Sequence, residues 1–215
     1  PTANTGRGAA DTSVAPSPAG GSGIVAIAMG SFNLPTSLTL NSGTAAATLT
    51  SNINNINLTV NSTSASSTIS GVISGAVAFT YNNAATYNAS ALGVINLTQA
   101  NTYSGGTLVS AGKLLVGNNA AMGTGAVTVG SANTSVGTVD LNGYSVANAF
   151  TLNGGAAVGA LINSNTTTTG TASGSVSVPT NISLGGAGTL NISGAITANS
   201  TGIAFVGTGN YTLNN

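Results

Sequence analysis

Apolar and small polar residues alternate along most of this chain in short runs, and each run closes on glycine or asparagine. A run has two apolar residues at positions i and i+2, with a hydroxyl or amide residue between them. Because side chains alternate between the two faces of a strand, the apolar pair lies on one face. Clear examples lie at residues 38–40, 47–49, 58–60, 126–130, 138–143, 149–154 and 188–194. Each run predicts a short strand, and its glycine or asparagine, which adopts positive φ at little cost, predicts a corner.

The stretch at residues 101–118, NTYSGGTLVSAGKLLVGN, holds two such runs around a glycine corner and predicts a strand, a turn and a strand. Short strands at regular spacing are typical of a sandwich, a barrel or a solenoid. Repetition of one kind of run favours the solenoid, so we predict one all-β domain, a parallel β-solenoid over residues 24–215. Two internal echoes accompany the pattern, with residues 67–74 matching 190–197 at an offset of 123 and residues 93–98 resembling 209–214 at an offset of 116.

The sequence NTYSGGT at residues 101–107, followed by SAGKLLVG at residues 110–117, resembles the autotransporter-associated β-strand repeat (passenger-associated transport repeat) of bacterial surface passenger domains. The segments that usually follow in such passengers have counterparts at residues 121–129, 139–143 and 150–154. The resemblance covers residues 69–215 and implies a right-handed parallel β-helix, secreted or displayed on the cell surface, with an architectural role. Autotransporters also carry a C-terminal membrane barrel, for which these 215 residues leave no room. We therefore expect either a passenger fragment or a free-standing secreted subunit.

Residues 1–23 differ from the rest, since they are rich in proline, glycine, alanine, serine and threonine and show no apolar alternation. They predict an extended or disordered N-terminal arm. Strand-like residues then begin abruptly at Ile24, Val25 and Ile27, a run of the kind that adds to an exposed sheet edge. Such a run would let the arm order against a neighbouring subunit. The longest apolar run, at residues 23–30, is too short to cross a bilayer as a helix, so no transmembrane segment is expected.

Charge is nearly absent from the chain. Charged residues make up 2% of it, where an average domain is roughly a quarter charged, and there is no histidine and no cysteine. The four formal charges are Arg7, Asp11, Lys113 and Asp140, for a net charge of zero. Acid–base and nucleophilic catalysis both need paired reactive groups, so no enzyme is expected. Metal and cofactor sites lack their usual ligands, and nucleic-acid binding lacks cations to neutralise phosphates.

Lys113 and Asp140 occupy outward alternates of their strands, because Leu114 and Val139 beside them take inward positions. We expect both as solvated surface residues, and an exposed pair of this kind contributes about 0–1 kcal/mol. The tyrosines do not recur at one spacing, which favours core or corner packing over a carbohydrate platform. An ice-binding surface requires the same threonine face in successive coils, and the single run of threonines at residues 166–169, in a predicted loop, does not provide it.

The C-terminal residues predict an uncapped end. Residues 207–215 contain no proline and no charge and predict no capping helix, whereas natural solenoids usually cap their ends against association. Since the chain also lacks the surface charge that keeps proteins apart, we expect a structural subunit that binds copies of itself head to tail in an extracellular filament, fibre or sheath. The expected subunit contacts are Ile24, Val25, Ile27, Tyr211 and Leu213. A passenger fragment that acts as an adhesin on a cell surface or matrix is the alternative.

Overall fold

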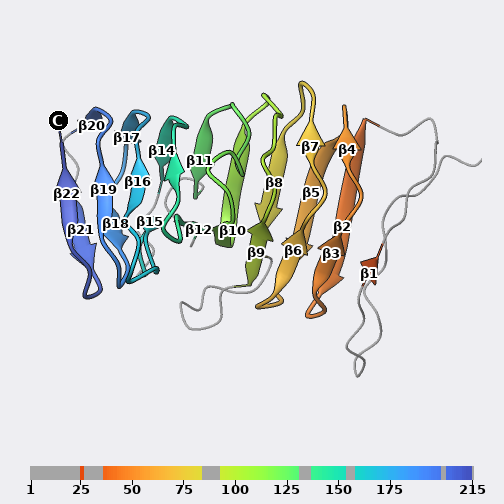
Figure 1. The fold of residues 1–215 in the computed structure, drawn as a ribbon, viewed down its shortest axis with the longest axis horizontal. Helices are drawn as coiled ribbons and strands as arrows, with labels where there is room; N and C mark the ends of the chain where they lie inside the picture. The colour runs from red at the N-terminus through yellow and green to blue at the C-terminus, as the bar shows by residue number, and fades with distance from the viewer. Residues whose placement is uncertain are drawn as a thin grey trace, which may run out of the picture.

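The computed structural model describes residues 25–26, 36–83, 93–130, 137–153, 158–199 and 202–214. Every regular element in this part of the chain is a β-strand, and the strands wind into a parallel β-solenoid of about seven turns (Figure 1). The predicted fold class is confirmed. The N-terminal arm predicted for residues 1–23 lies outside the described residues, as do Ile24 and Ile27.

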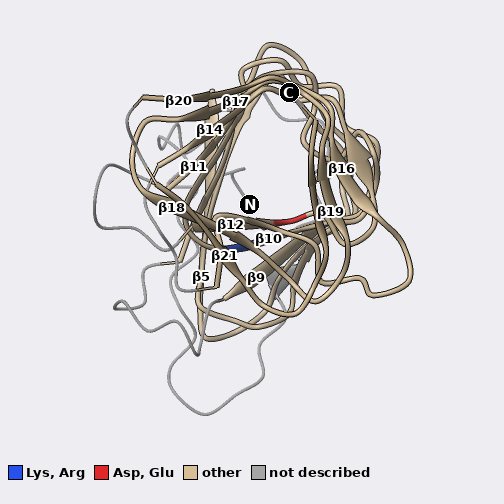
Figure 2. Cartoon of the chain, turned by 90° about the vertical axis from the view of Figure 1, so that its left-hand side faces the viewer, with Lys and Arg blue, Asp and Glu red and all other residues tan. Residues whose placement is uncertain are grey.

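Each coil of the solenoid runs along three faces, which are seen end-on in Figure 2. Face 1 stacks β2 (Ser37–Gly43), β5 (Asn57–Ser62), β8 (Phe79–Asn82), the first half of β10 (Thr107–Val116), β11 (Val127–Val129), β14 (Phe150–Leu152), β17 (Val176–Val178) and β20 (Ile196–Ala198). All neighbouring strands of this face are parallel, so the chain advances by one strand per turn.

The other two faces are built in the same way. Face 2 stacks β1 (Val25–Ala26), β3 (Ala47–Leu49), β6 (Ser67–Ile69), β9 (Val94–Leu97), the second half of β10, β12 (Gly137–Asp140), β15 (Leu161–Ile162), β18 (Ile182–Gly185) and β21 (Ile203–Val206). Face 3 stacks β4 (Ile53–Asn54) on β7 (Ile73–Ser74), and farther along β13 (Ser145–Val146), β16 (Gly170–Ala172), β19 (Leu190–Ile192) and β22 (Tyr211–Leu213).

Register fixes which side chains form the core. We call a set of residues paired in register through successive coils a column. One inward column of face 1 contains Leu38, Leu58, Phe79, Thr107, Val127, Phe150, Val176 and Ile196. Within β11, Val127 and Val129 are fully buried while Thr128 between them is half-exposed, as the alternation predicts. Burial of each such aliphatic side chain contributes about 1.5–3 kcal/mol, and the buried residues form one continuous cluster along the solenoid.

The central strand shows why the sequence needs glycine at a corner. β10 passes from face 1 to face 2 without a break and bends at Gly112, whose φ is 88°. A Cβ atom on Gly112 would lie 2.6 Å from Cε1 of Tyr81 and 2.8 Å from Cβ of Asn83. The predicted strand, turn and strand are thus one bent strand, because glycine allows the bend while both halves stay paired.

Buried asparagines hold other corners together. The amide nitrogen of Asn101 donates to the carbonyl of Ala121 at 2.6 Å, and its amide oxygen accepts from the backbone nitrogen of Ile73 at 2.8 Å. Asn148 donates to the carbonyls of Gly123 and Gly125 at 3.1 and 2.8 Å. The backbone cannot satisfy its own polar groups where a strand ladder is interrupted, so these amide side chains replace it.

The internal echoes in the sequence do not mark equivalent positions in the coil. β6 lies on face 2, whereas its counterpart β19 lies on face 3, and β9 and β22 are separated in the same way. The number of residues in a coil also varies. Thr107 pairs with Val127, twenty residues later in the chain, but with Phe79, twenty-eight residues earlier. A run followed by a glycine satisfies a strand and a corner on any face, so local similarity alone does not place it.

Two tyrosines lie inside the core, as predicted from their irregular spacing. Tyr81 and Tyr103 are fully buried, and their hydroxyls meet the carbonyl oxygen of Ser62 at 3.0 Å and the hydroxyl of Thr107 at 2.5 Å. Burial raises the pKa of both phenols above the usual value, and for Tyr103 the hydrogen bond with Thr107 lowers it to a smaller extent. The folded protein therefore resists ionisation of both side chains.

We expect the protein to lose stability in alkali. The folded pKa of Tyr81 and Tyr103 is raised, so their contribution is fully present below about pH 10, the pKa of tyrosine in an unfolded chain, and is lost as pH rises toward the folded pKa. The free energy of unfolding should fall by about 1.4 kcal/mol per pH unit for each buried tyrosine. Urea denaturation at a series of pH values measures this slope. The variant Tyr81→Phe should have a shallower slope, because only Tyr103 then contributes to it. A midpoint that stays constant in alkali would contradict the prediction.

Candidate functional site

The ion pair between Lys113 and Asp140 is the first candidate for chemistry. The two residues lie on neighbouring coils, in β10 and β12, with 3.6 Å between Nζ of Lys113 and Oδ2 of Asp140. Oδ1 of Asp140 accepts hydrogen bonds from the backbone nitrogens of Asn142 and Ser164, both at 3.0 Å. Ser164 belongs to the following coil, so the carboxylate joins three successive coils.

The solvated position expected for Asp140 is wrong. Its side chain is fully buried, whereas that of Lys113 is 30% exposed. Alternation does direct Asp140 outward, in register with Leu115, but all four residues of β12 are buried and the outer side of that strand is covered as well. The pair therefore joins coils, and the described residues contain no group of three or more metal-ligating side chains around it.

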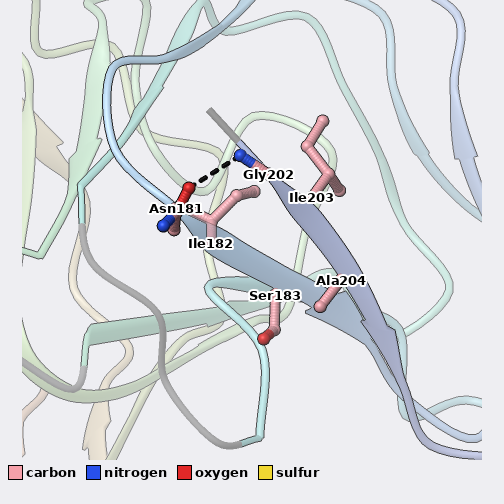
Figure 3. Close-up of a pocket in the computed structure, with 6 residues that line it drawn as sticks. All are labelled: Asn181, Ile182, Ser183, Gly202, Ile203 and Ala204. Atoms are coloured by element: carbon pink, nitrogen blue, oxygen red, sulfur yellow. Dashed lines mark hydrogen bonds between the residues drawn. The ribbon is translucent and has the colours of Figure 1, made fainter. Parts of the chain in front are cut away.

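Two shallow hollows of the surface contain no ionisable side chain. One, of about 370 Å³, lies between β18 and β21 on face 2 and is lined by Asn181, Ile182, Ser183, Gly202, Ile203 and Ala204 (Figure 3). Its polar contact is internal, since Oδ1 of Asn181 accepts from the backbone nitrogen of Gly202 at 2.7 Å. The other, of about 460 Å³, lies on face 1 beside Gly106 and Ala126. Neither offers an acid, a base or a nucleophile with a base beside it.

The last described coil, formed by β20, β21 and β22, exposes large apolar side chains to solvent; we call it the terminal coil. Phe205 and Leu213 are the large apolar side chains most exposed in the described part of the chain, at 48% and 40%. Their register partners one coil earlier, Leu184 and Ile192, are 1% and 0% exposed. The inward columns therefore continue into the terminal coil, where no further described coil covers them.

The exposed side chains of the terminal coil form an ordered group. The rings of Phe205 and Tyr211 lie 4.7 Å apart between centroids, at an angle of 43°, and the hydroxyl of Tyr211 donates to the carbonyl of Val206 at 2.5 Å. These contacts connect faces 2 and 3 within the terminal coil. The terminal coil thus presents a preformed apolar surface.

The structure places the predicted contact residues at opposite ends. Tyr211 and Leu213 lie in the terminal coil, whereas Val25 pairs with Ala47 at the other end of face 2 (Figure 1). The chain does not bring the two sets together within one molecule. The sequence analysis missed Phe205, whose signal was an aromatic residue within the apolar run at residues 203–206.

Comparison with known proteins adds no relative. No family model matches the chain. Nor does any curated protein or solved structure match it. The resemblance of residues 101–117 to the autotransporter-associated repeat stays a prediction. In the part of the chain that the structure describes, no helix is long and apolar enough to cross a membrane.

Proposed function

We propose that this protein is a structural subunit that associates head to tail, as a secreted homopolymer, into an extracellular filament, fibre or sheath. The uncovered apolar core of the terminal coil is the observation that supports the proposal. Phe205 and Leu213 would become buried under a further coil, as Leu184 and Ile192 already are. A second copy of the chain supplies such a coil.

The strand edges at the two ends suit this association. Within the described chain, β21 and β22 each pair on one side only, and so do β2 and β4 at the other end. A following copy would place its β1, the first described strand of face 2, against β21. A parallel ladder would then continue from copy to copy on that face, with its edge N–H and C=O groups paired.

Electrostatics do not oppose the contact. Lys113 and Asp140 are the two charged side chains among the described residues, and they neutralise each other on face 2, away from both ends. Neutral surfaces that repel nothing favour association, and few groups are present whose titration would release it. Such contacts should hold over a wide range of salt and pH, which suits an extracellular material.

We expect the double variant Phe205→Asp, Leu213→Asp to lose self-assembly. Negative-stain electron microscopy of the unmodified chain, purified without a partner, should show long filaments of constant width. An unpaired buried charge costs about 3 kcal/mol or more, so the variant should need at least about a hundredfold higher concentration to assemble. The matched control is Thr102→Asp, Ser145→Asp, which adds the same charge at exposed positions of middle coils and should leave filaments unchanged.

Dispersed short rods of the unmodified chain at every concentration would overturn the proposal. The adhesin alternative would then be favoured, and it predicts monomers that bind a cell surface or matrix. Equal loss of filaments in both double variants would also count against the terminal coil, because it would indicate a general effect of added charge.

A further inference from the structure

A column of hydroxyl side chains runs along the outside of face 1. Register places these residues one after another from the first described coil to the last: Thr39, Thr59, Thr80, Leu108, Thr128, Thr151, Ser177 and Thr197. Each of them except Thr197, in the terminal coil, lies between buried inward residues; Thr39, for example, lies between Leu38 and Leu40. Leu108, beside the hollow at Gly106, is the one position without a hydroxyl.

An amide column accompanies the hydroxyls two residues farther along the strands. Asn41, Asn61 and Asn82 are paired in register, and Ser110 follows in the next coil. Nδ2 of Asn61 donates to Oδ1 of Asn41 at 2.6 Å, and the hydroxyl of Ser110 donates to Oδ1 of Asn82 at 3.1 Å. These bonds hold the amide side chains in a repeating arrangement.

Face 2 lacks this regularity, and on face 3 the four outward residues paired in register are Ser145, Thr171, Asn191 and Thr212. The corresponding outward column of face 2 contains Thr48, Thr68, Asn96, Leu115, Asp140, Ile162, Gly185 and Val206, with no constant residue type. Abundant threonine in the chain therefore does not by itself produce the hydroxyl column. A face that repeats one polar group from coil to coil suits a ligand that is itself periodic.

We propose that face 1 binds ice. Parallel strands lie about 4.8 Å apart, which is close to the repeat of water oxygens along the a axis of hexagonal ice. Each threonine hydroxyl donates and accepts hydrogen bonds, as a lattice water does, and branching at Cβ restricts its side chain to few rotamers. The strands β11, β14, β17 and β20 follow one another in parallel register on one side of the coil (Figure 2).

The chemistry of the face argues against two other kinds of ligand, a sugar that stacks on aromatic rings and an ionic surface. Its aromatic residues, Phe79, Tyr81 and Phe150, point into the core, so no ring is available to stack on a sugar. The outward columns contain no charge, and the Lys113–Asp140 pair lies on face 2, which leaves nothing to attract an ionic surface. An uncharged lattice of hydrogen-bond donors and acceptors complements this surface.

The test compares bulky substitutions on face 1 with the same substitutions elsewhere. Ice is grown slowly from a dilute solution of the full chain, and the protein in the ice and liquid fractions is measured together with the shape of single ice crystals. We expect the unmodified chain to enter ice and shape crystals, and Thr59→Tyr, Thr128→Tyr to be excluded from ice. The controls Thr68→Tyr and Thr171→Tyr, at half-exposed outward positions of faces 2 and 3, should keep ice binding.

Exclusion of the unmodified chain from ice would overturn the proposal. So would equal loss in the face 1 variant and its controls, or a face 1 variant that changes only lateral association of the chain in liquid water. Circular dichroism of each variant checks that it folds. The variant Phe205→Asp, Leu213→Asp should bind ice as a monomer, since one chain carries the whole column, and this separates the inference from head-to-tail assembly.

Discussion

Replacing Asn163 with leucine should lower the free energy of unfolding by about 3–5 kcal/mol, because several backbone groups lose their partner at once. Asn163 is fully buried at the corner that follows β15. Its amide nitrogen donates to the carbonyls of Asn165, Thr168 and Thr189, at 3.2, 2.9 and 2.7 Å. Its amide oxygen accepts from the backbone nitrogens of Gly143 at 2.8 Å and Asn165 at 3.3 Å.

Leucine has the same number of side-chain heavy atoms as asparagine and the same branching at Cγ, but it can neither donate nor accept a hydrogen bond. Each buried backbone group left without a hydrogen bond costs about 1–3 kcal/mol, and part of that cost is relieved where Asn165 and Thr168 reach solvent. Urea denaturation measures the loss. The control is Asn191→Leu on face 3, whose side chain meets that of Asn214 in an exposed contact at 3.4 Å; it should change stability by less than about 0.5 kcal/mol. Similar losses in both variants would show that Asn163 has no special role.

Replacing Gly188 with alanine should be the second strongly destabilising change, by about 3 kcal/mol. A Cβ atom there would lie 1.8 Å from the carbonyl oxygen of Asn165 in the preceding coil. Backbone atoms that are themselves hydrogen-bonded cannot move aside cheaply; Gly188 donates to the carbonyl of Asn163 at 2.9 Å. The cost is steric, since the clash is with backbone of the adjacent coil rather than with the glycine's own conformation.

Gly202→Ala is the matched control. The nearest atom to its added Cβ is Oδ1 of Asn181 at 3.5 Å, an ordinary van der Waals distance. Thermal unfolding followed by circular dichroism should place Gly188→Ala several degrees below the unmodified chain, at about 2–4 °C for each kcal/mol, and Gly202→Ala close to it. Equal midpoints for the two variants would mean that coils separate easily at this corner.

The sequence predicted strands and inward residues well, because alternation is a local property. Leu114, Val127 and Val139 are buried as their positions in the runs require. It did not predict which face each strand occupies, since corners of similar composition join all three faces. Thr39 and Thr59 lie twenty residues apart in the chain, whereas Thr80 is followed on its face by Leu108, so no fixed period reveals the column.

The exposure of Phe205 and the burial of Asp140 could not be predicted from the sequence either, because both depend on how the coils stack. Tyr211 and Leu213 were expected near an open end, and they lie in the terminal coil, but Phe205 joins them only because β21 stacks on β18. Alternation directed Asp140 outward and could not show that this side of β12 is covered. Whether an outward residue is solvated depends on the neighbouring coils and loops, which the sequence of a single strand does not reveal.

The position of Lys113 has a consequence for the durability of the protein among secreted proteases. Trypsin-like enzymes cleave after lysine or arginine, and the sequence offers them Arg7 and Lys113 alone, of which Lys113 lies in the described solenoid. That residue sits in the middle of β10, with β9 on one side and β12 on the other. A protease binds its substrate as an extended segment that is free of other pairings. The peptide bond after Lys113 is the one bond of this kind in the described coils, and its strand pairs with β9 and β12, so these pairings would have to break before trypsin-like enzymes could cleave it.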